Sequence, residues 1–154
     1  MSIRCAAKAL VISEGRVLLN RCQDPEGHVY YDLPGGGQQP YETMEDAVKR
    51  EVLEETGYPI AIDRFAALAE EIYEDDALRK QFPDYTHRIY HVFLAHLLDS
   101  PRRDPTETDR NQRASEWHTL EEASSLPVLY PRGIGTLLSG VPEVPVYLGT
   151  CFIK

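Results

Sequence analysis

The chain has 154 residues, of which 42% are hydrophobic, and a formal net charge of −9 at pH 7. This length fits one compact domain, residues 1–154, and the acidic balance argues against binding DNA or RNA, which requires a basic patch. No apolar run approaches the ~20 residues that cross a bilayer, so we expect a cytoplasmic protein with neither a membrane nor a DNA partner.

The first part of the chain predicts a β-hairpin, a short strand and a sharp turn. Residues 5–12 are small and β-branched, and a turn at 13–15 leads to apolar residues 17–19. Residues 30–33 predict a further strand, which Pro34 ends. The three glycines that follow allow the backbone to bend before the next element.

A helix is predicted to begin near Met44. Thr43 and Asp46 form a variant of the capping box, in which a side-chain oxygen binds the backbone of the first turn. Gly57 followed by Pro59 is a stop signal. The apolar stripe of this helix, at ~100° per residue, consists of Met44, Ala47, Val48 and Val52.

Three glutamates on this helix predict a metal site. Glu51 and Glu55 fall inside the apolar stripe, four residues apart, and Glu54 stands at its edge. Like charges at this spacing repel, and carboxylates beside an apolar face lose solvation. A bound cation would hold them together, and Mg²⁺ above all suits such oxygen ligands.

The remainder of the chain alternates strands with polar segments. We expect one strand over residues 60–73, a polar loop with a turn of helix over 74–85, and a central strand over 86–98. Residues 102–115 are charged, poor in apolar side chains and expected to be mobile.

The last part of the chain predicts a strand, two helical segments and an edge strand. The strand covers residues 116–118, and Thr119 with Glu122 signals a helix start. Pro131 opens a predicted final helix that ends at Leu138. Residues 144–152 predict an edge strand because they include a proline. Together these elements indicate a mixed α+β domain.

The segment from Gly36 to Tyr58 resembles the Nudix box. The family pattern is a glycine, five residues, Glu, seven residues, then Arg-Glu-apolar-x-Glu-Glu-x-Gly-apolar, and no required residue is missing here. The matching positions are Gly36, Glu42, Arg50, Glu51, Val52, Glu54, Glu55, Gly57 and Tyr58. Leu33-Pro34 and Trp117 also resemble the family. The resemblance implies a Nudix-type α/β/α sandwich, with a mixed β-sheet between helices.

The same resemblance implies a reaction. Nudix hydrolases cleave a nucleoside diphosphate linked to another group, at the pyrophosphate, by attack of a metal-activated water. The implied ligands for Mg²⁺ or Mn²⁺ are Glu51, Glu54, Glu55 and the Gly36 carbonyl. Glu42, just before the helix, is placed to reach the same ions or their waters.

The expected catalytic residues are Glu54, Arg50, Glu51 and Glu55. Arg50 is placed to pair with a glutamate and orient it, a role that the family also assigns. The general base is either Glu54 or an acid from a distant loop, with Glu107, Asp109 and Glu116 as candidates.

The substrate stays open between a (deoxy)nucleoside triphosphate and a sugar nucleotide such as ADP-ribose, with capped RNA or a diadenosine polyphosphate as a third option. Candidates for base stacking are Tyr30, Tyr31, Phe82, Tyr85 and Tyr90, and candidates for phosphate or ribose contacts are Arg21, Lys80, Arg88 and Arg102. The acidic run Glu70, Glu71, Asp75 and Asp76 predicts a solvated edge.

The alternative function is a Nudix-fold module that binds and senses a nucleotide without cleaving it. Such modules tend to lose carboxylates from the box, whereas Glu51, Glu54 and Glu55 are all present. The three cysteines show neither the even count nor the spacing of a disulfide framework or zinc site, so we expect reduced thiols. Family members are often dimers, which leaves a homodimer open.

Overall fold

The computed structural model describes residues 2–154, and the strands among these residues pair into one mixed β-sheet. The strands are β1 (Arg4–Ser13), β2 (Arg16–Gln23), β3 (Val29–Asp32), β4 (Gly35–Gly37), β5 (Ile60–Tyr73), β6 (His87–Leu97), β7 (Gln112–Thr119), β8 (Leu129–Tyr130) and β9 (Val146–Ile153). The helical elements are α1 (Met44–Thr56), α2 (Asp76–Gln81), α3 (Leu120–Ser124) and the 3-10 turn η1 (Ile134–Leu137).

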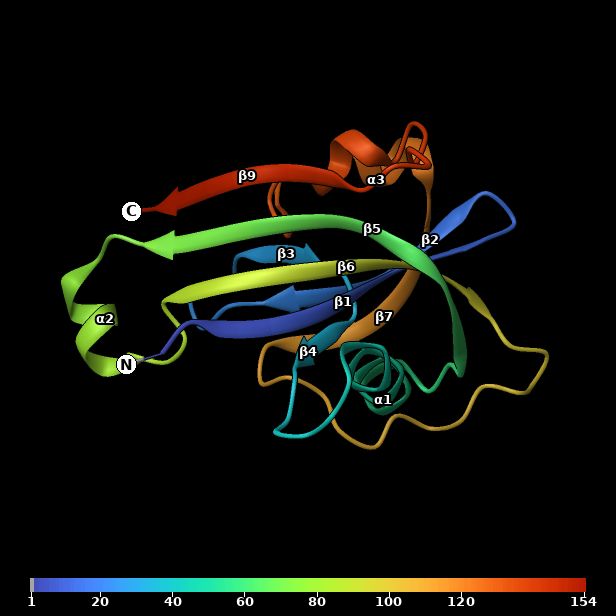
Figure 1. The fold of residues 1–154 in the computed structure, drawn as a ribbon, viewed down its shortest axis with the longest axis horizontal. Coiled ribbons are helices and arrows are strands. Elements are labelled where there is room, and N and C mark those ends of the chain that lie inside the picture. The colour runs from blue at the N-terminus through green and yellow to red at the C-terminus, as the bar shows by residue number, and fades with distance from the viewer. Residues whose placement is uncertain (1) are drawn as a thin grey trace.

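The sheet combines parallel and antiparallel pairs. Its strand order is β8-β3-β2-β1-β6-β5-β9, with β4 added to β1 and β7 added to β2. β1 pairs in parallel with β6, whereas β5 runs antiparallel to β6 and parallel to β9. Figure 1 shows α1 below the sheet and α3 above it. The predicted mixed sheet between helices is therefore confirmed, with β6 central and β9 at an edge.

Both ends of α1 are as the sequence predicts. The Thr43 hydroxyl accepts a hydrogen bond from the Asp46 amide at 3.1 Å, which satisfies one of the free amides of the first turn. Gly57 ends the helix in the left-handed conformation, with φ of 77°, where a side chain would be strained. The glutamates between these two caps consequently have fixed positions along the helix.

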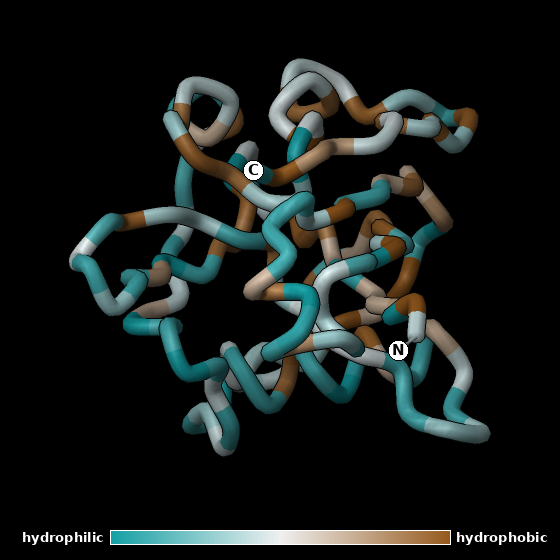
Figure 2. Tube along the Cα trace, turned by 90° about the vertical axis from the view of Figure 1, so that its left-hand side faces the viewer, coloured by the Kyte–Doolittle hydropathy of each residue, from teal (hydrophilic) through white to brown (hydrophobic). Residues whose placement is uncertain are grey.

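Apolar packing fixes the orientation of α1 on the sheet. Ala47, Val48 and Val52 are fully buried and pack in one cluster with residues of β1 and β6. Each buried valine contributes roughly 1.5–3 kcal/mol relative to an exposed one. Figure 2 shows that the lower margin of the molecule, on the side of α1, is mostly hydrophilic. The apolar stripe of α1 thus faces the sheet and its polar side faces solvent.

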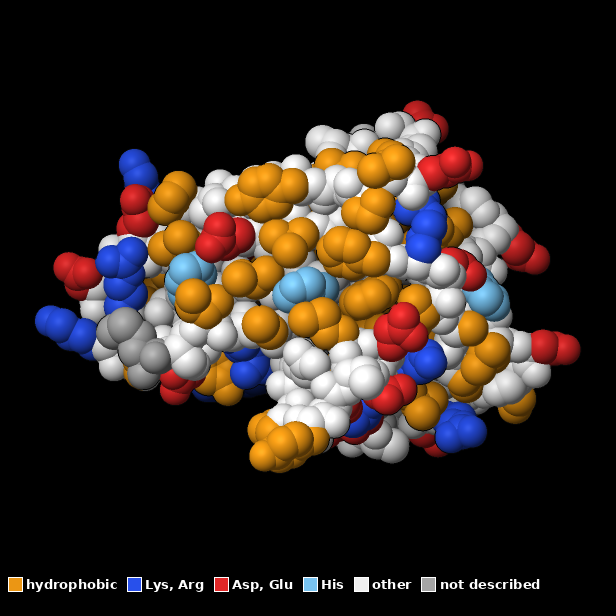
Figure 3. Space-filling view, viewed as in Figure 1, with side chains coloured by type: hydrophobic (Ala, Val, Ile, Leu, Met, Phe, Trp, Pro, Cys, Tyr) orange, Lys and Arg blue, Asp and Glu red, His pale blue; other side chains and the backbone are white. Residues whose placement is uncertain are grey.

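A second apolar cluster packs residues of several strands against residues of α3 and η1. It joins Leu10 of β1, Leu19 of β2, Val92 of β6 and Ile134 of η1. The outward face of β5 and β6 carries hydrophobic and histidine side chains (Figure 3). None of the helices within residues 2–154 is long and apolar enough to cross a membrane.

Three features of the fold differ from the sequence-based expectations. The glycines that we expected to bend the chain form the strand β4, which pairs with Ala6 to Lys8 of β1. The expected helix from Pro131 to Leu138 is wrong, because Gly133 takes a left-handed φ of 88° and only the short η1 follows. The expected mobile segment 102–115 includes the start of β7 and makes backbone hydrogen bonds to the end of α1.

Candidate active site

Arg50 brings three glutamates of the segment 42–54 together. Its Nε donates to Glu42 Oε1 at 2.7 Å, and its Nη2 donates to Glu42 Oε2 at 3.1 Å. Its Nη1 donates to Glu51 Oε1 at 2.8 Å and to Glu54 Oε2 at 3.3 Å. The Arg50 side chain is 24% exposed, so these charge-assisted bonds are only partly screened by water. The arginine therefore contacts all three carboxylates, at the position where the sequence predicts that it pairs with a glutamate.

Glu51 lies directly against the backbone of β4. A Cβ atom added at Gly36 would stand 2.6 Å from the Glu51 carboxyl carbon and within 2.8 Å of both its oxygens. Only glycine at residue 36 therefore allows this approach. Burial raises the pKa of Glu51 above its ordinary value, although the neighbouring Arg50 opposes the shift. The carboxylate and the Gly36 backbone form one oxygen-rich corner.

Glu55 is buried, with 4% of its surface exposed. Its Oε2 accepts hydrogen bonds from Asn20 Nδ2 at 2.7 Å and from the Gly35 amide at 3.1 Å. Burial raises the pKa of Glu55 to about 8, which the positive charge of Lys8 counteracts in part. Since both hydrogen bonds go to Oε2, Oε1 retains the capacity to bind a cation.

Lys8 is a buried cation that the sequence-based site did not include. Its Nζ donates to Asp32 Oδ2 at 2.9 Å and to the carbonyl oxygens of Leu33 and Gly35 at 3.1 and 3.2 Å. Burial disfavours the charge, but Asp32 and Glu55 raise the pKa of Lys8 above its ordinary value. Lys8 is the one charged residue in the apolar run of β1. A charge inside a buried strand indicates that other groups of the protein pair with it. It holds the chain that leads into β4.

The loop after β6 carries the acids that we considered as general bases. The backbone amides of Thr106 and Glu107 donate to the Glu54 carbonyl at 2.9 and 3.1 Å, so the loop is held against α1. Asp109 lines the cleft beside Gly36 and Glu51. Its charge adds to the effect of burial in raising the pKa values of Glu51 and Glu55.

The other two loop candidates are placed differently. Glu107 is exposed, and it does not line the cleft that contains Gly36. Glu116 lies on β7, where its carboxylate is 3.0 Å from His118 Nε2. Asp109 is therefore the loop acid with the best access to the box glutamates.

The residues of this corner fit a hard divalent cation. Carboxylates of Glu42, Glu51, Glu54 and Glu55 and the carbonyl of Gly36 offer only oxygen donors, as Mg²⁺ prefers. Glycine at residue 36 leaves open the space beside Glu51 that a side chain would fill. Among residues 2–154, the trio of acidic and histidine side chains whose ligand atoms all lie within 4.8 Å of one another is a different one, Asp24, Glu26 and His28 in the loop after β2, so the box glutamates stand further apart than that. Two of its three members are exposed, and hydrogen bonds between Asp24 and His28 account for its geometry.

Two adjoining cavities extend from this corner. The smaller, of about 260 Å³, is lined by Gly36, Gly37 and Glu51 on one side and by Arg4 and Tyr85 on another. The larger, of about 560 Å³, lies between β3, β5, β6 and β8. Residues that line both are Asp32, Arg88, Tyr90 and Asp109. The two cavities thus form one cleft that begins beside Glu51.

Some of the residues that we expected to bind a substrate line the cleft, whereas others lie elsewhere. Tyr30, Tyr90 and Arg88 line the larger cavity and Tyr85 the smaller one. Arg102 instead stacks on Tyr58 and donates to a helix carbonyl. The prediction that Glu71 lies on a solvated edge is wrong. It is 1% exposed and lines the larger cavity, because it lies on the inner face of β5.

Comparison with known proteins identifies relatives of this chain. Residues 3–136 match the model of the NUDIX domain. The nucleoside triphosphatase NudI of Enterobacter sp. (strain 638) is 36% identical over 95 residues, which cover 61% of this chain and 64% of that protein. NudI of Klebsiella pneumoniae (strain 342) is 32% identical over 100 residues, covering 63% and 69%. The match thus spans just under two thirds of the length of the Enterobacter protein.

Solved structures share the fold. A NUDIX hydrolase from Nitrosomonas europaea superposes with a TM-score of 0.71 at 18% identity, covering 99% of this chain and 80% of that one. A MutT NUDIX hydrolase from Burkholderia pseudomallei superposes with a TM-score of 0.65 at 28% identity, covering 92% and 100%. The arrangement of sheet and helices is therefore that of these proteins.

Proposed function

This chain belongs to the NUDIX family, and we propose that it is a Mg²⁺-dependent pyrophosphohydrolase that cleaves the diphosphate of a nucleoside diphosphate derivative. One water is added across a phosphoanhydride bond, which yields two phosphate-bearing products. The observation that carries the proposal is the grouping of Glu42, Glu51 and Glu54 around Arg50, beside the Gly36 backbone.

Each residue of the corner has a proposed role. Glu51, Glu54, Glu55 and the Gly36 carbonyl hold Mg²⁺, with Glu42 near the same ions or their waters. A cation held by these residues would neutralise charge on the diphosphate oxygens and would lower the pKa of a bound water. Arg50 keeps Glu51 and Glu54 in position through its hydrogen bonds. Glu54 or Asp109 takes the proton of the attacking water.

A nucleoside triphosphate is the proposed substrate type, ahead of a sugar nucleotide. Relatives named nucleoside triphosphatase support this choice. Arg4 lines the cavity beside the glycines, where its positive charge would meet phosphate oxygens. Cleavage rather than sensing is favoured because all three box glutamates are present and one of them, Glu51, lines the cleft. A cytoplasmic location and a homodimer stay predictions.

The test is product release from a panel of nucleoside triphosphates, ADP-ribose, other sugar nucleotides and dinucleoside polyphosphates, with Mg²⁺ and with chelator. We expect cleavage of one class that requires Mg²⁺. The matched variants are Glu51→Gln and Glu45→Gln, since Glu45 lies exposed in the first turn of the same helix. The first variant should lose turnover and the second should retain it. Nucleotide binding without any cleavage would instead favour a sensing module.

A further inference from the structure

The larger cavity contains polar atoms without partners. Within residues 2–154, four buried side-chain nitrogen or oxygen atoms lack a hydrogen bond, namely Asp32 Oδ1, Glu71 Oε1, Arg88 Nε and Gln112 Oε1. Three of these four side chains, all except Gln112, line the same cavity. Buried polar atoms without partners are uncommon because each one costs about 1–3 kcal/mol. Their concentration on one cavity indicates that a ligand supplies the missing bonds.

Of the unpaired acceptors on this cavity, Glu71 is the one that lies away from Gly36 and Glu51. It lines only the larger cavity, whereas Asp32 and Arg88 also line the smaller one. Its Oε2 accepts a hydrogen bond from the Tyr90 hydroxyl at 3.0 Å, which fixes the carboxyl group. Its Oε1 has no partner at hydrogen-bond geometry, and the Arg132 backbone amide is the other polar group that acts on this carboxyl. A ligand that enters from the glutamates therefore meets Asp32 and Arg88 first and Glu71 last.

The walls around Glu71 suit a flat ring. Tyr30 and Tyr130 stand edge to face, with ring centroids 5.7 Å apart, and both line the cavity. The Arg88 guanidinium lies 5.1 Å from the Tyr73 ring centroid and donates to the Tyr73 hydroxyl at 2.6 Å. Aromatic rings and a stacked guanidinium are surfaces on which a nucleobase stacks. Sugar hydroxyls lack such a flat face.

We propose that the larger cavity holds the nucleobase of the substrate and that Glu71 Oε1 accepts a hydrogen bond from an exocyclic amino group of that base. This inference rests on the proposed function and names its substrate class: a nucleotide of an amino-bearing base, such as cytosine or adenine. An oxo group at the same position presents lone pairs to the carboxylate and leaves Oε1 without a donor. Glu71 is a specificity residue and does not touch the diphosphate.

The carboxyl group must be ionised to act as a pure acceptor. Burial raises the pKa of Glu71 above its ordinary value, while the Arg88 guanidinium and the Tyr90 hydroxyl favour the carboxylate. Binding is therefore measured on the alkaline side of neutrality, at about pH 8.

The experiment compares pairs of monophosphates in which an exocyclic amino group is exchanged for an oxo group, in chelator, by isothermal titration calorimetry. The exchange also turns the adjacent ring nitrogen from an acceptor into a donor. The pairs are dCMP with dUMP and AMP with IMP. We expect the wild-type protein to bind one amino member about 10- to 100-fold more tightly than its oxo partner, the usual range for a hydrogen bond to a charged group. Equal affinities within both pairs would overturn the inference without any variant.

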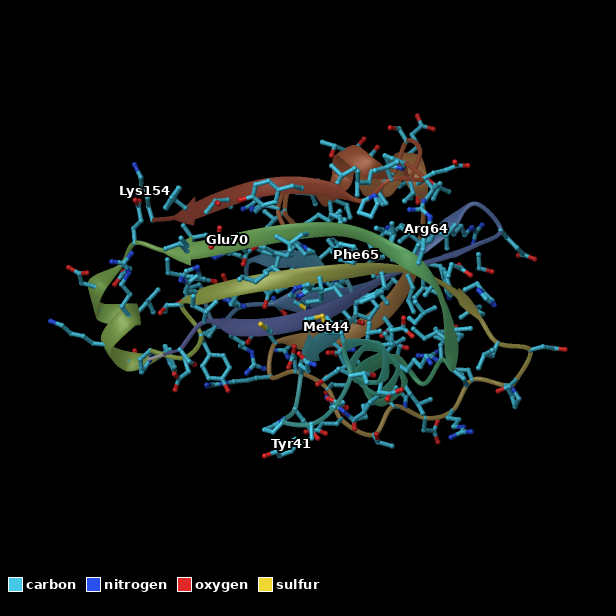
Figure 4. All side chains as sticks on the ribbon, viewed as in Figure 1. Tyr41, Met44, Arg64, Phe65, Glu70 and Lys154 are labelled. Atoms are coloured by element: carbon cyan, nitrogen blue, oxygen red, sulfur yellow. The ribbon has the colours of Figure 1, made fainter. Side chains whose placement is uncertain are left out.

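Glu71→Gln then tests the residue itself, because its amide can both donate and accept. The preference should fall to within about threefold. The control is Glu70→Gln on the same strand. Glu70 lies on the visible face of β5 (Figure 4), where it binds His87 and Thr150 on the opposite side of the sheet from Glu71. That variant should keep the wild-type preference.

The outcomes separate this inference from the proposed function. An unchanged preference in Glu71→Gln, with Mg²⁺-dependent cleavage intact, would show that Oε1 binds a buried water or a sugar hydroxyl. A preference that depends on Glu71 without any cleavage would retain the base site and refute the hydrolase. Thermal unfolding of both variants checks that each one folds.

Discussion

Arg50 binds both carboxylate oxygens of Glu42, through Nε at 2.7 Å and Nη2 at 3.1 Å. The two residues stand eight positions apart, with Glu42 in the turn before α1 and Arg50 in the middle of the helix. Nε and Nη2 therefore hold the turn after β4 against the helix. Nη1 donates to Glu51 and Glu54 and so orients both carboxylates. The single ammonium group of a lysine cannot make this set of hydrogen bonds.

Arg50→Lys should consequently lower both turnover and stability. The lysine keeps the charge but reaches one carboxylate at a time, so we expect the free energy of unfolding to fall by about 1–2 kcal/mol and kcat to fall about tenfold or more. Chemical denaturation and steady-state kinetics measure the two effects. The control is the reverse exchange at the preceding residue, Lys49→Arg, which should change neither turnover nor stability. Wild-type kcat in Arg50→Lys would refute the orienting role.

Gly36→Ala should weaken metal binding with little effect on the fold. The added methyl group would meet the Glu51 carboxylate at 2.6–2.8 Å, so Glu51 must move away from its place beside β4. We expect the affinity for Mg²⁺ to fall about 10-fold or more, measured by titration of the metal into the apoprotein. Gly140→Ala is the control, because no atom lies within 4 Å of a Cβ at that position. Equal Mg²⁺ affinities of the two variants would contradict the proposed site.

The general base can be identified by comparing Glu54→Gln with Asp109→Asn. Both side chains border the corner that holds Glu51, one from α1 and one from the loop after β6. The variant of the true base should lose kcat by about 10²-fold or more, while retaining nucleotide binding. Near-normal turnover in Glu54→Gln together with a large loss in Asp109→Asn would assign the proton transfer to the loop. Small losses in both would exclude both residues.

Glu55 predicts a pH dependence of stability in the metal-free protein. Its pKa is about 8 in the folded chain against an ordinary 4.5. Between these values the folded chain keeps a proton that the unfolded chain has lost, so stability falls as the pH rises through this window. The decline amounts to on the order of a few kcal/mol.

The measurement is the unfolding free energy between about pH 5 and pH 8 in chelator. Glu55→Gln should show a flatter profile than the wild type, because the amide does not titrate. Added Mg²⁺ should flatten the wild-type profile as well, since the cation replaces the proton. Parallel profiles of the wild type and Glu55→Gln would show that Glu55 does not hold this proton.

The sequence predicts the elements that have a side-chain pattern and misses those that the backbone alone creates. α1 follows from its caps at Thr43 and Gly57 and from its apolar stripe. β4 consists of three glycines, so no side chain indicates that they pair with β1. The start of β7 was missed for a related reason. Gln112 is buried there by hydrogen bonds to Asn20 and to the Glu55 carbonyl, not by an apolar neighbour.

The candidate site likewise has a part that the sequence predicts and a part that only the fold creates. Arg50 and the three glutamates lie on one helix, whose period fixes their mutual positions, so spacing was sufficient to group them. The base cavity is built by residues from β3, β5, β6 and β8, which only the tertiary fold brings together. Glu71 was mistaken for part of a solvated acidic run because its neighbour Glu70 does face outward. Alternation along a strand, not charge, separates the two.

Gly57 has a second effect besides ending α1. Its carbonyl accepts the Arg103 amide at 2.8 Å, and a Cβ at residue 57 would collide with the Arg103 carbonyl. The path of the loop that carries Asp109 is thus fixed by main-chain contacts to Gly57 and Glu54. It also requires that residue 57 has no side chain. The Arg102 side chain adds one further hydrogen bond, to the Thr56 carbonyl at 2.9 Å. The distance between Asp109 and the helix therefore depends on the backbone at the end of α1 more than on the acids that the loop carries.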